Sequence, residues 1–186
     1  MTRIVAGSVG GRQIAVPPGR ATRPTTDRAR EALFATLETL VDLDGARVLD
    51  LFAGSGAVGL EALSRGAHHA LLVESDARAA RLIVENARVL GLAGAQVAHG
   101  PVARVLAGRP SEGGYHVVFA DPPYSMPDAE LDAVLADLVT HGWLADGAVA
   151  AVERASRGAG PSWPEGMEPV RNRRYGEGML WYGRRL

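Results

Sequence analysis

The sequence predicts an α/β domain built on a mostly parallel sheet. Short apolar runs alternate with segments of helical periodicity along nearly the whole chain, which is typical of a parallel sheet covered by helices on both faces. Several of these runs end at an acid, a glycine turn or a pair of prolines. With 186 residues, of which 47% are hydrophobic, the chain has room for one domain with a normal core and a small appendage.

Composition narrows the class of protein. No apolar run approaches the roughly eighteen residues of a membrane span, and the first residues lack the apolar region of a secretory signal. The chain has no cysteine, and its histidines have no spacing that indicates a metal site. We therefore expect a cytoplasmic, monomeric protein that uses neither membrane nor metal.

The net charge of −1 hides an uneven distribution, and every basic residue is arginine. Residues 1–30 hold six arginines against one acid, and residues 170–186 hold five against one, so the segment between them is acidic. Arginine-rich ends on an acidic body indicate a polyanion held at the edges of the fold. The alternative is a coding bias against lysine, with both ends merely solvated.

The chain begins with two strand-like runs, residues 3–6 and 12–16, around a glycine-containing loop. A two-stranded hairpin is marginal in water, so it must lean on the main body or become ordered on a ligand. We interpret residues 1–24 as a β-hairpin extension that grips phosphates, and residues 25–186 as the main domain. A simple edge extension of the sheet is the alternative.

A helix of about fourteen residues is expected from Asp27 to Leu40, where apolar residues recur at helical spacing. Thr25 or Thr26 is suited to cap its start. Together with Arg23, the two threonines are equally suited to bind an anion or a substrate edge there.

The next segment reads as strand, glycine turn and helix, from Val48 to about Arg65. Its glycines match the G-x-G-x-x-G fingerprint of dinucleotide sites. Asp50, however, would repel a pyrophosphate and hold a cationic amino group. Glu74, which closes the following strand, can accept both hydroxyls of a ribose. An amino-acid nucleoside such as S-adenosylmethionine has both groups.

The alternation continues through the second half of the chain. A helix from Ala77 to Leu90 should end at Gly91, and a strand at residues 95–99 should bring His99-Gly100 to the adenine of the cofactor. Residues 102–107 and 128–139 predict helices, and residues 148–153 predict a strand. Residues 170–175 and 179–182 predict a closing antiparallel hairpin.

The apolar run at residues 117–120 stops at Asp121-Pro122-Pro123-Tyr124. The run predicts a buried parallel strand, and two prolines prevent it from pairing further, so a rigid shelf forms where ligands bind in open α/β sheets. Asp121 and the Pro122 carbonyl are two acceptors beside the Tyr124 ring, which suits the exocyclic amine of a nucleobase. The alternative is a solvent-exposed turn.

These motifs together form a pattern known from one family. In chain order they are Arg3-Ile4-Val5-Ala6-Gly7, Arg23-Pro24-Thr25-Thr26-Asp27-Arg28, Asp50 to Gly56 with Gly59 to Gly66, and Asp121 to Tyr124. The chain resembles the RsmD-type 16S rRNA (guanine-N2) methyltransferases over nearly its whole length. The Arg-Pro-Thr-Thr-Asp-Arg segment points to this family, whereas Asp-Pro-Pro-Tyr is shared with adenine-N6 and other amino methylases.

The resemblance implies a class I, Rossmann-like, S-adenosylmethionine-dependent fold with a seven-stranded, mostly parallel sheet. It implies methylation of one guanine of 16S rRNA on N2, within an assembling or assembled 30S subunit. The implied catalytic residues are Asp121, Pro122, Pro123 and Tyr124. The implied cofactor-binding residues are Asp50, Phe52, Ala53, Gly54, Ser55, Gly56, Glu74, Ser75, His99 and Gly100. The expected RNA contacts are Arg3, Arg12, Arg20, Arg23, Thr25, Thr26, Arg28, Arg173 and Arg174.

One departure concerns the adenine, because many related methylases carry Asp or Asn where this chain has His99-Gly100; contact through backbone groups is the expected substitute. A DNA amino methyltransferase, acting on adenine N6 or cytosine through the same Asp-Pro-Pro-Tyr motif, is the main alternative, although so short a chain has no separate target-recognition domain. An RNA-binding protein with a degenerate cofactor site does not fit the intact acids. A NAD-dependent oxidoreductase leaves Asp121 to Tyr124 unexplained.

Overall fold

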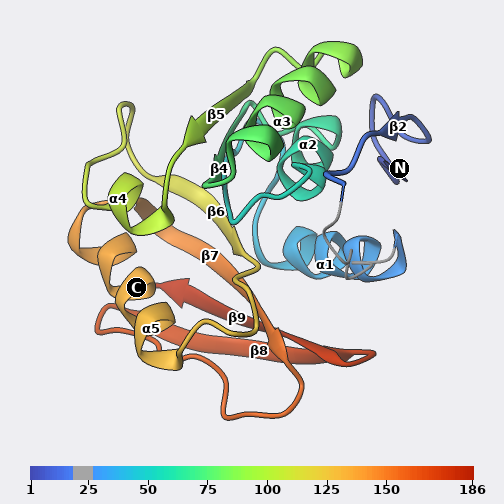
Figure 1. The fold of residues 1–186 in the computed structure, drawn as a ribbon. Coiled ribbons are helices and arrows are strands. Elements are labelled where there is room, and N and C mark those ends of the chain that lie inside the picture. The colour runs from blue at the N-terminus through green and yellow to red at the C-terminus, as the bar shows by residue number, and fades with distance from the viewer. Residues whose placement is uncertain (19–26) are drawn as a thin grey trace.

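The central layer of the protein is a seven-stranded sheet, described here from a computed structural model that covers residues 1–18 and 27–186 (Figure 1). The strand order is β5-β4-β3-β6-β7-β9-β8. Strands β3 to β7 are parallel, and β9 and β8 close the sheet in antiparallel pairing. The predicted mostly parallel sheet with a C-terminal hairpin is therefore confirmed. Its strands are β3 (Arg47–Leu51), β4 (His69–Glu74), β5 (Ala95–His99), β6 (Tyr115–Ala120), β7 (Leu144–Ala155), β8 (Met167–Tyr175) and β9 (Gly178–Arg185).

Helices cover both faces of the sheet, as the alternating pattern predicts (Figure 1). One hydrophobic core lies between the sheet and α1, α2 and α3, and a second lies between the sheet and α4 and α5. Because both faces are covered, the inner parallel strands are apolar on both sides. The helices are α1 (Asp27–Leu40), α2 (Ala57–Ser64), α3 (Ala77–Leu90), α4 (Val102–Leu106) and α5 (Asp128–Thr140).

Local signals set most element boundaries. Helix α3 spans the predicted residues, because the Asp76 side chain accepts a hydrogen bond from the Ala79 N–H at 2.8 Å and Gly91 ends the helix with φ of 69°. Strand β7 is longer than the predicted 148–153. Its amino end pairs with β6 and its carboxyl end pairs with β9, so tertiary pairing extends it in both directions.

The strand order reverses between β3 and β6. From β3 the chain builds outward through β4 to β5 on one side, and from β6 through β7 on the other. Such a switch point leaves a crevice at the carboxyl ends of the two strands, because the connections leave in opposite directions. The ends of β3 and β6 are the segments that carry Asp50 and Asp121.

The N-terminal extension forms a separate two-stranded sheet of β1 (Thr2–Arg3) and β2 (Gln13–Ile14). Its strands are shorter than predicted, but Ile4 and Ile14 are buried in the same core as α1, α2 and α3. The hairpin thus leans on the main body, as its marginal intrinsic stability requires. The division into two domains at residue 24 stays a prediction.

The outermost strand, β8, is unusual in its exposure. Residues 168–174 are all exposed, so both faces of the strand are open to solvent. The turn between β8 and β9 lies at the carboxyl-end edge of the sheet, since Ala155 at the end of β7 pairs with Gly178. The β8–β9 hairpin therefore extends the sheet next to the crevice.

Candidate active site

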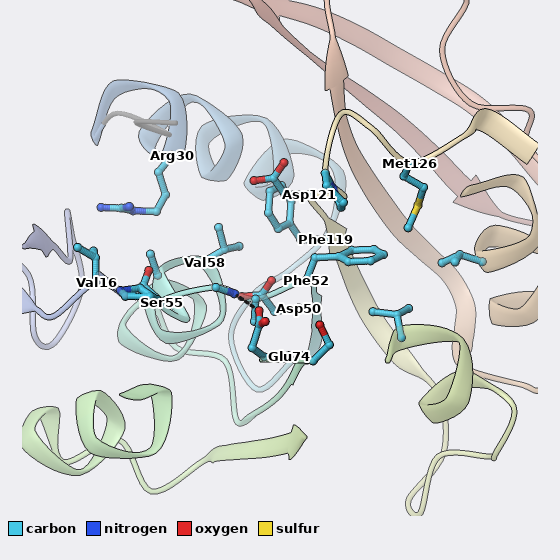
Figure 2. A pocket seen from close by; sticks show the side chains of 18 of the residues that line it. Val16, Arg30, Asp50, Phe52, Ser55, Val58, Glu74, Phe119, Asp121 and Met126 are labelled. Atoms are coloured by element: carbon cyan, nitrogen blue, oxygen red, sulfur yellow. Dashed lines mark hydrogen bonds between the residues drawn. The ribbon is translucent and has the colours of Figure 1, made fainter. Parts of the chain in front are cut away.

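A cavity of about 1190 Å³ occupies the crevice at the switch point. Its wall is formed by the glycine turn after β3, the ends of β4 and β6, the first turn of α4, one face of α5, the start of α1 and the N-terminal extension. Figure 2 shows Val16, Arg30 and Ser55 on one side of it and Phe52 and Met126 on the other. The cavity is large enough for a nucleoside cofactor and part of a second ligand.

Asp50 lies at the floor of this cavity and is 1% exposed. One carboxylate oxygen accepts the Gly59 N–H at 2.9 Å, which ties the strand to helix α2. Burial raises the pKa of Asp50 well above its usual value of 3.8; the Gly59 N–H opposes this rise, and the nearby negative charges of Asp121 and Glu74 add to it. A cation placed in the cavity would lower the free-energy cost of ionising the buried Asp50 carboxyl group.

Glu74 closes β4 beside Asp50 (Figure 2) and is 2% exposed. Its carboxylate accepts the Gly54 N–H at 2.7 Å and the Asp76 N–H at 3.0 Å. These two bonds fix the glycine turn and the start of α3 relative to β4. The predicted ribose acceptor is therefore held in a defined position at the wall of the cavity.

The glycine turn contributes four of its predicted residues to the cavity: Phe52, Ala53, Gly54 and Ser55. Gly56 lies behind them with φ of 81°, and a Cβ there would be 2.9 Å from the Ile83 side chain. Its role in this structure is close packing of the turn on α3.

Phe52 has a feature that the sequence did not reveal. Its φ of 60° makes it the one non-glycine residue with positive φ in the described parts of the chain. Such a conformation costs about 1 to 3 kcal/mol and persists only where the surroundings impose it. This strained residue lies in the middle of the glycine turn, at the wall of the cavity.

At the end of the cavity where the adenine is predicted, only one of the three expected residues lines the wall. Ser75 lines the cavity, together with Pro101 and Val102 of the following loop and helix. The His99 ring lies 3.2 Å from the Ser75 carbonyl oxygen, and the Gly100 N–H donates to the Glu74 carbonyl at 3.0 Å. These two residues support the wall from outside rather than forming it.

The loop after β6 brings Asp121 and Pro123 to the cavity. Pro122 is buried, and Tyr124 is 39% exposed beside it. The Tyr124 hydroxyl lies close to Gly178, 3.6 Å from where a Cβ would stand. The ring therefore sits between the rim of the cavity and the β8–β9 hairpin.

Arg154, near the end of β7, holds this loop in place, although it belongs to none of the sequence motifs. Its guanidinium donates to the carbonyls of Pro123 at 3.3 Å and Met126 at 2.8 Å, and it pairs with Asp128 at 2.9 Å. Its side chain is only 12% exposed. No local pattern signals this role, because the contacts span about thirty residues of sequence.

The expected RNA contacts are distributed over three places. Arg28 lines the cavity, whereas Arg3 pairs with Asp27 at 2.6 Å and Arg12 donates to the Val89 carbonyl at 2.8 Å. Arg173 and Arg174 are exposed on β8, near its turn to β9. The remaining four, Arg20, Arg23, Thr25 and Thr26, lie outside the described residues.

Two absences hold for residues 1–18 and 27–186. No group of three or more His, Cys, Asp or Glu side chains is arranged to hold a metal ion. None of the helices there combines the length and apolarity that crossing a membrane requires.

Strand order, the glycine turn and the acids at the ends of three neighbouring strands define an S-adenosylmethionine-dependent methyltransferase of the Rossmann-like class. The structure of the yhhF protein of Escherichia coli superposes with a TM-score of 0.87 and 34% identity, covering 99% of this chain and 97% of that one. The hypothetical protein TTHA0928 of Thermus thermophilus gives a TM-score of 0.76 and 35% identity, over 98% of both chains.

Sequence comparison then gives the family. The model of the family described as conserved hypothetical protein 95 matches residues 2–184, and the chain belongs to that family. Ribosomal RNA small subunit methyltransferase D of Escherichia coli K12 is 39% identical over 162 residues, which are 87% of this chain and 79% of that protein. The resemblance inferred from the motifs is confirmed.

Proposed function

We propose that this enzyme transfers a methyl group from S-adenosylmethionine to the exocyclic N2 amine of one guanine in small-subunit (16S) ribosomal RNA. The observation that carries the proposal is that Asp50 and Asp121 both line one cavity at the switch point. One acid suits the cationic end of the cofactor, and the other suits an amine. The names of the curated relatives support ribosomal RNA of the small subunit as the substrate.

The residues of the cavity fit the cofactor. Burial is the main cause that raises the pKa of the Asp50 carboxyl, and the α-ammonium group of the cofactor would stabilise its charged form. Glu74 offers acceptors for ribose hydroxyls, and the wall near Ser75 and Val102 offers room for the adenine. When bound, S-adenosylmethionine supplies an electrophilic methyl group on a sulfonium.

The Asp-Pro-Pro-Tyr loop acts on the amine. Asp121 and the Pro122 carbonyl accept its two hydrogens and draw the nitrogen from planar towards tetrahedral, which localises its lone pair. Both acceptors become more favourable as positive charge develops on that nitrogen. The two prolines and the Arg154 clamp keep the loop rigid, so orientation supplies a further part of the rate. Tyr124 stacks on the target base once that base has left its neighbours in the RNA, a contact worth about 1 to 3 kcal/mol.

Methyl transfer to defined substrates tests this function. Labelled S-adenosylmethionine is incubated with 30S subunits that lack the modification, with naked 16S rRNA and with duplex DNA, and the labelled nucleoside is identified after nuclease digestion. We expect N2-methylguanosine from the ribosomal substrate. Label in DNA as methyladenine or methylcytosine would overturn the substrate while leaving the cofactor site intact.

Affinity for S-adenosylmethionine is expected to rise with pH because of Asp50. In the free enzyme the raised pKa of Asp50 favours the protonated form of its carboxyl group. The contribution of this protonated form to the folding stability is fully present below pH 3.8, and it is lost as the pH rises through the folded-state pKa. A bound ammonium group favours the carboxylate instead, so binding releases a proton. Below the pKa of Asp50, affinity should fall by up to about tenfold per pH unit.

Equilibrium binding between about pH 4.5 and 7 measures this effect while the cofactor amine remains charged. Asp50→Asn is the control and should bind weakly at every pH. A wild-type affinity that does not change over this range would contradict the assignment of Asp50 to the ammonium group.

Arg173 and Arg174 are expected to contact RNA phosphates beside the cavity. Replacing both by alanine should weaken binding to 30S subunits and lower the slope of log affinity against log salt by about 1.4, or about 0.7 for each phosphate contact. Filter binding over a salt series measures the slope. The matched control replaces Arg104 and Arg109, two exposed arginines that belong neither to the cavity wall nor to the expected RNA contacts. If the slope falls by the same amount in both double variants, β8 has no special role in binding RNA.

A further inference from the structure

Asn86 on helix α3 joins two segments that the proposed function treats separately. Its side-chain carbonyl accepts the Ala15 N–H at 3.0 Å, and its amide group donates to the Ala15 carbonyl at 2.9 Å. The same amide group donates to the Ser55 carbonyl at 3.1 Å. The residue is 5% exposed, so these bonds are shielded from water.

The two segments that Asn86 joins both border the cavity. Ser55 belongs to the glycine turn, and Val16 and Pro17 follow Ala15 in the N-terminal extension; all three line the cavity. Figure 2 shows Val16 and Ser55 next to each other on the same side. The extension therefore forms part of the cofactor chamber, at the place where Asn86 ties it to the turn.

A second group of polar contacts holds the first half of the hairpin. Glu61 accepts the N–H groups of Val5 and Ala6 at 2.8 and 3.2 Å, and the Ser64 hydroxyl bonds the Ala6 carbonyl at 2.6 Å and the Val9 N–H at 3.1 Å. These bonds anchor that half of the hairpin to helix α2. Each of them ends on α2 and does not reach the glycine turn.

We propose that Asn86 is a positioning residue that makes the glycine turn and the N-terminal extension one unit. Cofactor binding fixes the Ser55 backbone, and Asn86 transmits this order to Ala15 and so to the extension. The inference rests on the proposed function only in that S-adenosylmethionine occupies the cavity. It assigns the hairpin a role in cofactor affinity that an RNA-binding appendage alone would not have.

Cofactor binding in the absence of RNA tests this link. Asn86→Ala should raise the Kd for S-adenosylmethionine about tenfold, the effect of a hydrogen-bond loss of roughly 1.4 kcal/mol. Ser64→Ala is the matched control: it removes two bonds to the same hairpin, and its Kd should stay within about twofold of wild type. Equal effects of the two variants, or no effect of Asn86→Ala, would overturn the proposal. Thermal unfolding confirms that both variants are folded before binding is compared.

Hydrogen exchange in the wild-type enzyme tests the same link without a substitution. Saturation with S-adenosylhomocysteine should slow exchange of the amides at residues 13–16, and the Ala15 N–H should be protected most, because Asn86 is fixed when the Ser55 backbone is fixed. Unchanged exchange there, with slowed exchange at residues 53–56, would show that the cofactor binds and that the link does not exist. Absence of cofactor binding would instead contradict the proposed function.

Discussion

Asp121→Ala is expected to lower the rate of methyl transfer by about a hundred- to a thousand-fold and to leave the affinity for S-adenosylmethionine within about twofold. Asp121 lies at the end of β6, across the switch point from Asp50, and lines the cavity where the amine must enter. Its negative charge is one of the causes that raise the pKa of Asp50, so its removal makes Asp50 easier to ionise. Cofactor binding should therefore not suffer.

Single-turnover assays on 30S subunits and equilibrium binding of the cofactor separate the two effects. Asp121→Asn keeps one acceptor oxygen and should retain partial activity. Asp146→Ala removes an exposed acid near the amino end of β7, at the end of the strand away from the cavity, and should behave as wild type. An Asp121→Ala enzyme with a wild-type rate would show that the loop binds the base without acting on its amine.

The sequence predicted those parts of the site that depend on local pattern and topology. Helix α1 and strand β5 have the expected bounds, because the residue pattern that predicts each of them is a local property of the sequence. The meeting of Asp50, Glu74 and Asp121 follows from a general property, since parallel strands bring their carboxyl ends to one edge.

The residues that were missed depend on contacts distant in sequence. Arg154 acts on a loop that precedes it by about thirty residues, and Asn86 bonds Ala15 at a separation of 71 residues. A polar residue on an amphipathic helix normally indicates a solvated face, so Asn86 did not stand out. The positive φ of Phe52 was equally hidden, because a bulky residue gives no sign that it adopts such a conformation.

Arg30 is the clearest case of a missed residue, and its replacement by alanine should destabilise the protein by about 3 to 5 kcal/mol. Its side chain is 1% exposed, and its guanidinium pairs with the fully buried Glu61 at 3.4 Å and with Asp27 at 3.3 Å. It also donates to the Arg3 carbonyl in the hairpin. In Arg30→Ala, Arg65 at 3.7 Å would be the one cation among the described residues that still pairs with the Glu61 carboxylate. The substitution would also leave a cavity between α1 and α2.

Thermal and urea unfolding measure the loss, which corresponds to a fall in Tm of roughly 10 °C for a chain of this size. Arg28→Ala, two residues earlier on the exposed side of the same helix, should change stability by less than about 0.5 kcal/mol. A loss below about 1 kcal/mol for Arg30→Ala would mean that Arg65 and the hairpin N–H groups suffice to stabilise the buried carboxylate. The expected large loss would show that a buried ion pair joins α1 to α2. Because Arg30 and Glu61 also bond the backbone of the hairpin at Arg3, Val5 and Ala6, the same pair lies where the extension meets the folded core.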